Sequence, residues 1–190
     1  MWSRYPSSAF IYFNFLNPAA HEIVFQANRS EIKAVKANNG ITLSLPKDEP
    51  RKILDSNTFS QALNAEVLEV YKGIDDFMVV LENEAAVANN NPNFNSIKSM
   101  DSRGLIITAK GEEVDFVSRW YGPQTGINED PATGSAHALL ATYWSKILNK
   151  LQMSARQLSK RVGHLKCEVK DDCVEITGEA KLYLKGNIQV

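Results

Sequence analysis

The sequence has few cysteines, no long apolar run and almost no net charge, and each of these features excludes a class of protein. Cys167 and Cys173 are too few among 190 residues for a disulfide framework, so we expect two free thiols and a cytoplasmic protein. No apolar run approaches the ~20 residues of a membrane helix, and residues 9–16 are not followed by the cleavage site of a signal peptide. A net charge of −1 provides no overall field that would attract nucleic acid. We therefore expect a globular protein that binds neither nucleic acid nor membrane.

Several common catalytic motifs are missing as well. The sequence contains neither a P-loop nor a G-x-G-x-x-G fingerprint, and no G-x-S-x-G elbow that would indicate a serine hydrolase. His137 has no second histidine or cysteine at the spacing of metal ligands. The residues therefore predict no metal site.

The order of the predicted elements is a helix, a small antiparallel sheet and then a longer region of mixed structure. Residues 9–16 are apolar and end at Asn17-Pro18, which predicts the second half of a buried helix. Asn39-Gly40 lies between two alternating runs and predicts a β-hairpin. We expect a short helix at residues 57–64 and a loop at residues 88–95. Strands are expected at residues 21–27, 31–35, 41–46, 75–83, 104–110, 112–121, 164–170, 173–178 and 180–186.

Two similar stretches suggest that the chain repeats one architecture. "SSAFIYFNFL" and "GSAHALLATYW" both begin with small residues and continue as apolar helices, and strands flank each of them. Strands around one apolar helix predict a sheet that wraps around it, and two copies would make two similar domains. Residues 46–50 form a polar stretch between two prolines, which is the best candidate for the linker.

The stretch "EDPATGSAH" concentrates polar, turn-forming residues directly before a predicted helix. Thr133, Gly134 and Ser135 lie where the first backbone N–H groups of this helix lack partners, which together with the helix dipole suits a carboxylate or phosphate. Asp, Thr and Ser before a helix are also ordinary N-caps, and spacing alone favours that explanation. A lone histidine such as His137 is more often packed than catalytic. The helix presents one apolar face, formed by Ala136, Leu139, Leu140, Tyr143, Trp144 and Ile147.

Two long stretches resemble the signature of a known family. "VDFVSRWYGPQTGINEDPATGSAHALLATYW" and "QLSKRVGHLKCEV" are similar to motifs of the phenazine-biosynthesis-like (PhzF-like) isomerases, whose fold is related to that of diaminopimelate epimerase. The resemblance covers about residues 7–190. It implies an α+β fold in which mixed β-sheets wrap around a central helix, in two similar domains with the active site between them. Residues 1–46 would be the remnant of the first domain and residues 51–190 the second domain, with the last strand returning to the first.

The resemblance also implies an activity and its residues. Members of this family shift a proton next to a carboxylate or carbonyl without a cofactor, using a carboxylic acid as general acid and base. Asp130 and His137 match catalytic positions, with Asp130 holding the substrate and orienting the acid and His137 in a supporting role. Thr133, Gly134 and Ser135 match positions that bind the carboxylate of the substrate. The expected partners are a small carboxylate-bearing metabolite and a second copy of the chain, as a homodimer.

The chain departs from the family pattern in three places. Val162 stands where the second motif has glycine, and no segment matches the one that carries the catalytic glutamate of the family. Trp2 and Ser3 stand where a Gly-His pair is expected. These departures predict an N-terminally truncated member, which leaves an inactive protein that binds an anion or self-associates as the alternative to an isomerase. A thioesterase is a third alternative, supported by architecture alone.

Truncation would also expose the apolar helix at residues 9–16. We expect it to leave an uncovered patch through which the chain self-associates. This patch would consist of Phe10, Ile11, Phe13, Phe15 and Leu16.

Overall fold

The computed structural model describes residues 4–27 and 29–186, so Trp2 and Ser3 lie outside the described residues. The helical segments are α1 (Arg4–Ile11), which continues as the π-helix η1 (Tyr12–Leu16), α2 (Asn57–Leu63), α3 (Glu84–Ala88), α4 (Phe94–Lys98), the 3₁₀ helix η2 (Pro123–Thr125) and α5 (Gly134–Leu148). The strands are β1 (Glu22–Gln26), β2 (Glu31–Ala37), β3 (Gly40–Pro46), β4 (Arg51–Ile53), β5 (Glu69–Lys72), β6 (Asp76–Val80), β7 (Gly104–Lys110), β8 (Phe116–Gly122), β9 (Ile127–Glu129), β10 (Gln152–Gln157), β11 (Gly163–Val169) and β12 (Cys173–Gly178).

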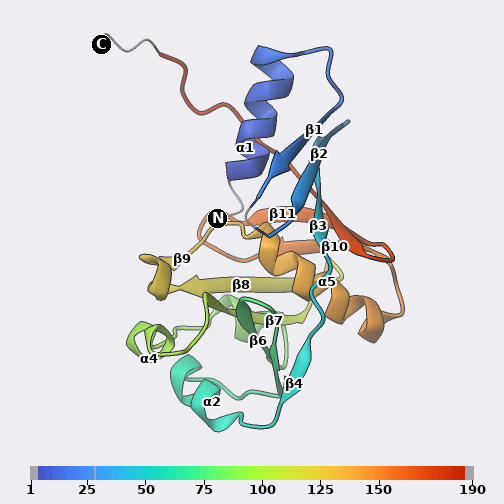
Figure 1. Cartoon of the computed structure of the whole chain (residues 1–190). Coiled ribbons are helices and arrows are strands. Elements are labelled where there is room, and N and C mark those ends of the chain that lie inside the picture. Colours follow the sequence, from blue (N-terminus) through green and yellow to red (C-terminus); the bar gives the residue numbers. More distant parts are fainter. Residues whose placement is uncertain (1–3, 28, 187–190) are drawn as a thin grey trace.

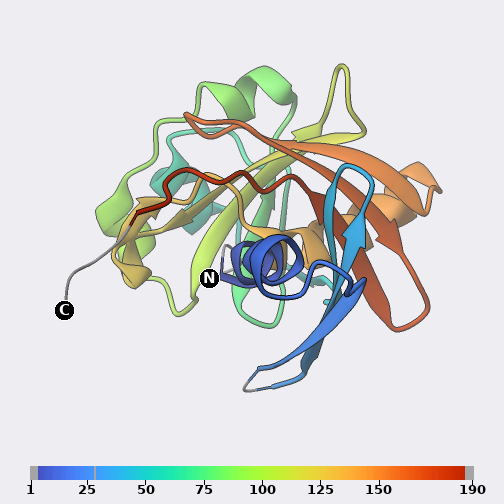
Figure 2. The same cartoon turned by 90° about the horizontal axis from the view of Figure 1, so that it is seen from above.

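All of these strands belong to one mixed sheet. Along the sheet the strand order is β1-β2-β3-β12-β11-β10-β8-β7-β6-β5-β4, with β9 paired to β8 outside this path. The pairs β6–β7 and β8–β10 are parallel and the other pairs are antiparallel. The sheet curves strongly, so that segments from both ends of the chain surround α5 (Figures 1 and 2). The predicted α+β fold, with a mixed sheet wrapped around a central helix, is confirmed.

Helix α5 is the centre of this arrangement because it is apolar on nearly every side. Its residues from Ala136 to Trp144 are all buried, so the helix contacts the sheet around its circumference and not through one stripe. Several polar atoms inside are paired: the indole Nε1 of Trp144 donates to Thr108 Oγ1 at 2.9 Å, and Thr142 Oγ1 donates to the carbonyl oxygen of Ala138 at 2.7 Å. Ile147 was expected on the buried face but is exposed, like its neighbour Lys146, because the last turn of α5 lies outside the core.

The predicted hairpin forms as expected and connects the N-terminal strands to the C-terminal ones. β2 and β3 are antiparallel and meet at Ala37 and Gly40. Gly40 has a φ of +132°, and a Cβ built there would lie 2.3 Å from the carbonyl oxygen of Gly178, so only glycine fits. β3 then pairs with β12 from Ile41 to Pro46. The division into domains at residues 46–50 stays a prediction.

Two expectations about the N-terminal helix need correction. The helical segment ends at Asn17-Pro18 as predicted, but its last turn is a π-helix and several of its apolar side chains are exposed. Phe13 was expected in the uncovered patch, yet it is buried against the core, and Phe10 is half-buried. The exposed patch is therefore smaller than predicted and consists of Ile11, Phe15 and Leu16.

The predicted loop and the last predicted strand also differ from the structure. The loop at residues 88–95 is shorter than expected, because Ala88 ends α3 and Phe94 begins α4. Residues 180–186 alternate like a strand, but the structure gives them no regular secondary structure. In the described residues this segment has no backbone partner, and alternation alone does not form a strand without one. Short strands β4, β5, β9 and β10 were not predicted.

Candidate functional site

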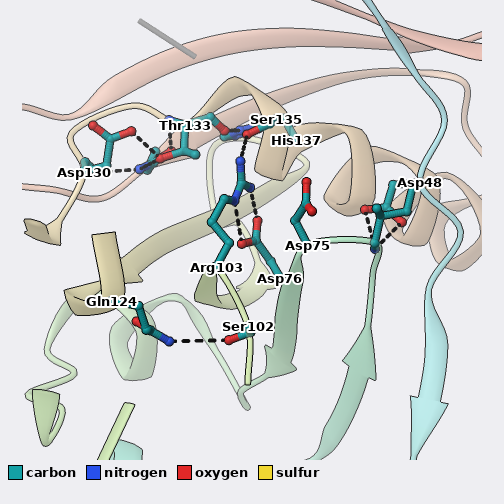
Figure 3. Close-up of polar contacts among 12 residues, drawn as sticks. Asp48, Asp75, Asp76, Ser102, Arg103, Gln124, Asp130, Thr133, Ser135 and His137 are labelled. Atoms are coloured by element: carbon teal, nitrogen blue, oxygen red, sulfur yellow. Dashed lines mark hydrogen bonds and ion pairs between the residues drawn. The ribbon is translucent and has the colours of Figure 1, made fainter. Parts of the chain in front are cut away.

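The start of helix α5 presents backbone N–H groups without protein partners. Thr133 occupies the N-cap position, but its side chain makes no capping hydrogen bond. Its hydroxyl donates instead to Asp130 Oδ2 at 2.6 Å (Figure 3). Within the described residues, the amides of Gly134 and Ser135 donate to no protein acceptor. Capping by Thr133, which the sequence favoured, therefore does not occur, and the helix dipole together with two free donors remains available to an anion.

The loop before α5 is held by a buried glutamine that the sequence did not indicate as part of the site. Gln157, from β10, accepts from the amide of Thr133 at 2.7 Å and donates to the carbonyl oxygen of Asp130 at 2.6 Å. Ser159 adds a hydrogen bond to the carbonyl oxygen of Pro131 at 2.9 Å. Both residues lie in the second motif, "QLSKRVG". The motif therefore pointed to this segment, but it did not show that these two side chains hold the loop before α5. Together they fix the conformation of the loop from Asp130 to Thr133.

His137 lies behind the loop and is fully buried. Its Nδ1 donates to the carbonyl oxygen of Thr133 at 2.9 Å, which fixes the tautomer and leaves Nε2 as the unprotonated nitrogen. Nε2 has no partner among the described residues. Burial lowers the pKa of His137 to about 4, although the hydrogen bond to Thr133 acts in the opposite direction. The imidazole is therefore neutral at pH 7 and orients the loop.

Ser135 is joined to a part-buried ion pair formed by Arg103 and Asp76. Arg103, directly before β7, donates from Nη1 to Ser135 Oγ at 2.8 Å. The same guanidinium binds the carboxylate of Asp76 through two hydrogen bonds, one from Nε at 3.0 Å and one from Nη2. Sequence reasoning missed both residues, because Arg103 lies 27 and 32 positions from its partners and belongs to no motif.

Two more carboxylates surround Arg103 and complete the polar cluster. Asp75 and Asp48 lie on the side of Asp76 away from Asp130 (Figure 3), and Asp48 accepts two hydrogen bonds from the amide of Ile74 at 3.0 and 3.1 Å. Burial would lower the pKa of Arg103, but Asp76 and the nearby charges of Asp75 and Asp48 outweigh it and raise the pKa. Burial, and to a lesser degree the charges of Asp76 and Asp75, raise the pKa of Asp48. Arg103 therefore stays charged throughout the accessible pH range.

The five residues predicted for the site thus come together at one end of α5, but they differ in what they can offer a ligand. The polar groups of Thr133 and one imidazole nitrogen of His137 are engaged with protein partners. Among the described residues, the groups without a protein partner are the amides of Gly134 and Ser135, the hydroxyl hydrogen of Ser135, Asp130 Oδ1 and the buried Nε2 of His137. Amide and hydroxyl donors next to a carboxylate suit a small anion that also exchanges a proton.

A hollow of about 470 Å³ lies elsewhere and is lined by none of these residues. Its walls come from β3, β10, β11 and β12 and mix lysine with acidic side chains, so its charge favours no particular ligand. In the described residues, no helix is both long and apolar enough to cross a membrane.

The fold and the site define the class of protein: an α+β protein in which a mixed sheet encloses one helix, with free hydrogen-bond donors at the start of that helix. The family model described as phenazine biosynthesis-like protein (PhzC-PhzF) matches residues 27–186. The chain belongs to this phenazine biosynthesis-like family.

Relatives and solved structures agree with this membership. An uncharacterized isomerase of Pseudomonas aeruginosa is 35% identical over 184 residues, which cover 97% of this chain and 71% of the relative. The crystal structure of a PhzF-family phenazine biosynthesis protein from Enterococcus faecalis is 39% identical and superimposes with a TM-score of 0.91, over 97% of this chain and 71% of that one. A putative phenazine biosynthesis PhzC/PhzF protein from Clostridium difficile is 34% identical, with a TM-score of 0.89 and the same coverage.

Proposed function

We propose that this protein is an isomerase that shifts a proton on a small carboxylate-bearing metabolite without a cofactor. The observation that carries the proposal is the open N-terminus of α5, where the amides of Gly134 and Ser135 have no protein acceptor among the described residues. A carboxylate is the substrate group that such donors recognise best. The isomerases among its relatives supply the reaction class.

In this proposal the predicted site residues divide into two groups. Gly134 and Ser135 bind the carboxylate directly. Asp130 contacts the substrate through the carboxylate oxygen that Thr133 leaves free. Thr133 and His137 act as positioning residues, because their polar groups hold the loop in place.

The test is exchange of carbon-bound hydrogen with solvent. The protein is incubated in D₂O with a panel of small unsaturated, hydroxy and amino carboxylates, and deuterium uptake next to the carboxylate is followed by mass spectrometry. We expect uptake on at least one compound, lost in Asp130→Asn and in Ser135→Trp, whose indole would fill the anion site. Binding of a compound without deuterium uptake would contradict the isomerase proposal and favour an inactive anion-binding protein.

We also propose that the protein forms a homodimer through its N-terminal region. The support is the exposed apolar patch of Ile11, Phe15 and Leu16, beside which the tail of the chain carries exposed Leu182 and Leu184. Exposed apolar surface that spans two segments favours association over a free monomer.

A further inference from the structure

We propose that Arg103 is a positioning residue, which together with Asp76 presents the hydroxyl of Ser135 as a hydrogen-bond donor to the bound anion. This inference rests on the proposed function, because it concerns how the same anion site is built. It adds two residues from outside the family motifs to the site.

The guanidinium of Arg103 is fixed before any ligand arrives. Asp76 is almost completely buried, with 5% of its side chain exposed, and it binds Arg103 through two parallel hydrogen bonds. The guanidinium carbon also lies 5.6 Å from the centre of the Trp120 ring. A planar guanidinium held at one edge by a carboxylate and packed beside an aromatic ring has little freedom to rotate. Nη1 therefore has a fixed direction, and one of its N–H groups points to Ser135.

The direction of the hydrogen bond determines what Ser135 can do. A guanidinium can only donate, so Ser135 Oγ must accept in the 2.8 Å contact with Arg103. The hydroxyl hydrogen of Ser135 is then directed away from Arg103. In the described residues Ser135 Oγ donates to no protein acceptor, so this hydrogen is free for a ligand. A serine held this way selects a hydrogen-bond acceptor, such as a carboxylate oxygen, over a donor such as an ammonium group.

The ion pair orients Ser135 without adding an unpaired positive charge to the anion site. Asp76 neutralises Arg103 at contact distance, and Asp75 and Asp48 add further negative charge on the far side. An unpaired arginine would attract many anions, whereas the paired one acts mainly through the serine it orients. Arg103 should therefore contribute to anion binding only as long as Ser135 is present.

A double-mutant cycle between Ser135 and the ion pair tests this dependence. Asp76→Asn combined with Arg103→Gln removes both charges together, so that neither is left buried and unpaired. Succinate is titrated into the wild-type protein, S135A, the D76N/R103Q variant and the triple variant. Affinity is measured by calorimetry, and the backbone amide signals of Gly134 and Ser135 report whether succinate binds at α5. Succinamide, which has the same shape without charge, is the matched control ligand.

We expect S135A to weaken succinate binding about tenfold, which is the usual loss for a hydrogen bond to a charged group. The D76N/R103Q variant should lose a similar factor, and the triple variant should bind no more weakly than S135A alone. Losses that multiply in the triple variant would overturn the inference, because Arg103 would then act independently of Ser135.

Two further results separate this inference from the proposed function. If wild-type protein binds succinate at Gly134 and Ser135 but the losses multiply, only the role of Arg103 is wrong. If no carboxylate of the panel perturbs these amides, the anion site itself is wrong and the inference falls with it. Should D76N/R103Q fail to fold, Arg103→Lys replaces it: lysine keeps the charge without the rigid fork, so at least a fivefold loss is expected and unchanged affinity overturns the inference.

Discussion

At the scale of single residues, burial decides what His137 contributes. The resemblance gives it a supporting role at a catalytic position, and in the structure it lies fully inside the protein and donates to the carbonyl oxygen of Thr133. The cost of placing a charge there lowers the pKa of His137 to about 4. A neutral imidazole with one fixed tautomer is a structural support for the loop that carries Asp130.

The stability of the protein should therefore depend on pH through His137. The unfolded chain takes up a proton near the ordinary pKa of histidine and the folded chain only near 4, so the unfolded state binds more protons between these values. The free energy of unfolding should fall by about 2 kcal/mol from pH 7 to pH 5 because of this residue. Urea unfolding of wild-type protein and His137→Asn at both pH values measures it. An equal pH dependence in the two proteins would contradict the prediction.

Gln157 should contribute to the stability of the protein, because it holds the loop before α5. Gln157→Leu removes the acceptor of the Thr133 amide and the donor to the Asp130 carbonyl, which leaves two buried groups unpaired. We expect a loss of about 2–4 kcal/mol in the free energy of unfolding. Ser159→Ala is the control in the same loop, because it removes only the single hydrogen bond to the carbonyl oxygen of Pro131, so it should cost less. Equal losses would show that the two hydrogen bonds of Gln157 contribute little beyond a single one.

The sequence indicates which residues of the candidate site lie together, but not which contacts hold them in place. Asp130 to His137 are contiguous, so the motif alone brings them to one place. Arg103 and Gln157 reach the site only because β7 and β10 lie close to the start of α5 in the folded sheet. No spacing along the chain encodes such contacts, and no charge pattern distinguished Arg103 from other arginines.

At the scale of elements, the side chain of Trp120 on β8 fits against glycines on β7 and β8. Gly104 and Gly122 lie beside the indole, and a Cβ built on either would approach ring atoms to 2.5 and 2.0 Å. The large ring on β8 therefore needs a residue without a side chain on the neighbouring strand. The same ring packs beside Arg103, so the two glycines also help to position the site.

Gly104→Ala should therefore destabilise the protein by about 1–3 kcal/mol through overpacking. The cost should largely disappear in a Trp120→Leu background, because the smaller side chain leaves room for the added methyl group. Thermal or urea unfolding of the four proteins in this cycle gives the coupling. If Gly104→Ala costs the same in both backgrounds, the strain arises from the backbone and not from Trp120.

The sequence predicted those elements that local signals along the chain determine. The hairpin of β2 and β3 and the buried helix α5 were found because turn residues and apolar spacing are local signals. Residues 180–186 alternate in the same way and yet form no strand, since strand formation requires a neighbour that the sequence does not reveal. Short strands such as β4 and β9, with three residues each, carry too little pattern to be recognised.

At the scale of the whole molecule, the surface around α1 differs from the rest of the protein. The core encloses α5 from Ala136 to Trp144, but Phe15 and Leu16 remain exposed at the end of η1, Leu16 by 72%. The C-terminal segment passes close to α1 (Figure 2), and Lys185 Nζ lies 5.6 Å from the centre of the Phe15 ring. That segment adds Tyr183, which is fully exposed. Apolar side chains from both ends of the described chain thus gather at one place.

We expect this surface to cause self-association at micromolar concentration, because water contact with Phe15 and Leu16 is unfavourable and a second copy can cover them. Phe15→Glu combined with Leu16→Glu places two like charges in the contact and should shift the protein to a monomer in sedimentation velocity at about 10 µM. Leu54→Glu is the matched control. Leu54 is 94% exposed and directly follows β4, which lies away from α1 (Figure 1), so this substitution should leave the association unchanged. A wild-type protein that sediments as a monomer under these conditions would contradict the prediction. Association that survives the double substitution but is lost on replacing Tyr183 and Leu184 would place the contact on the tail alone.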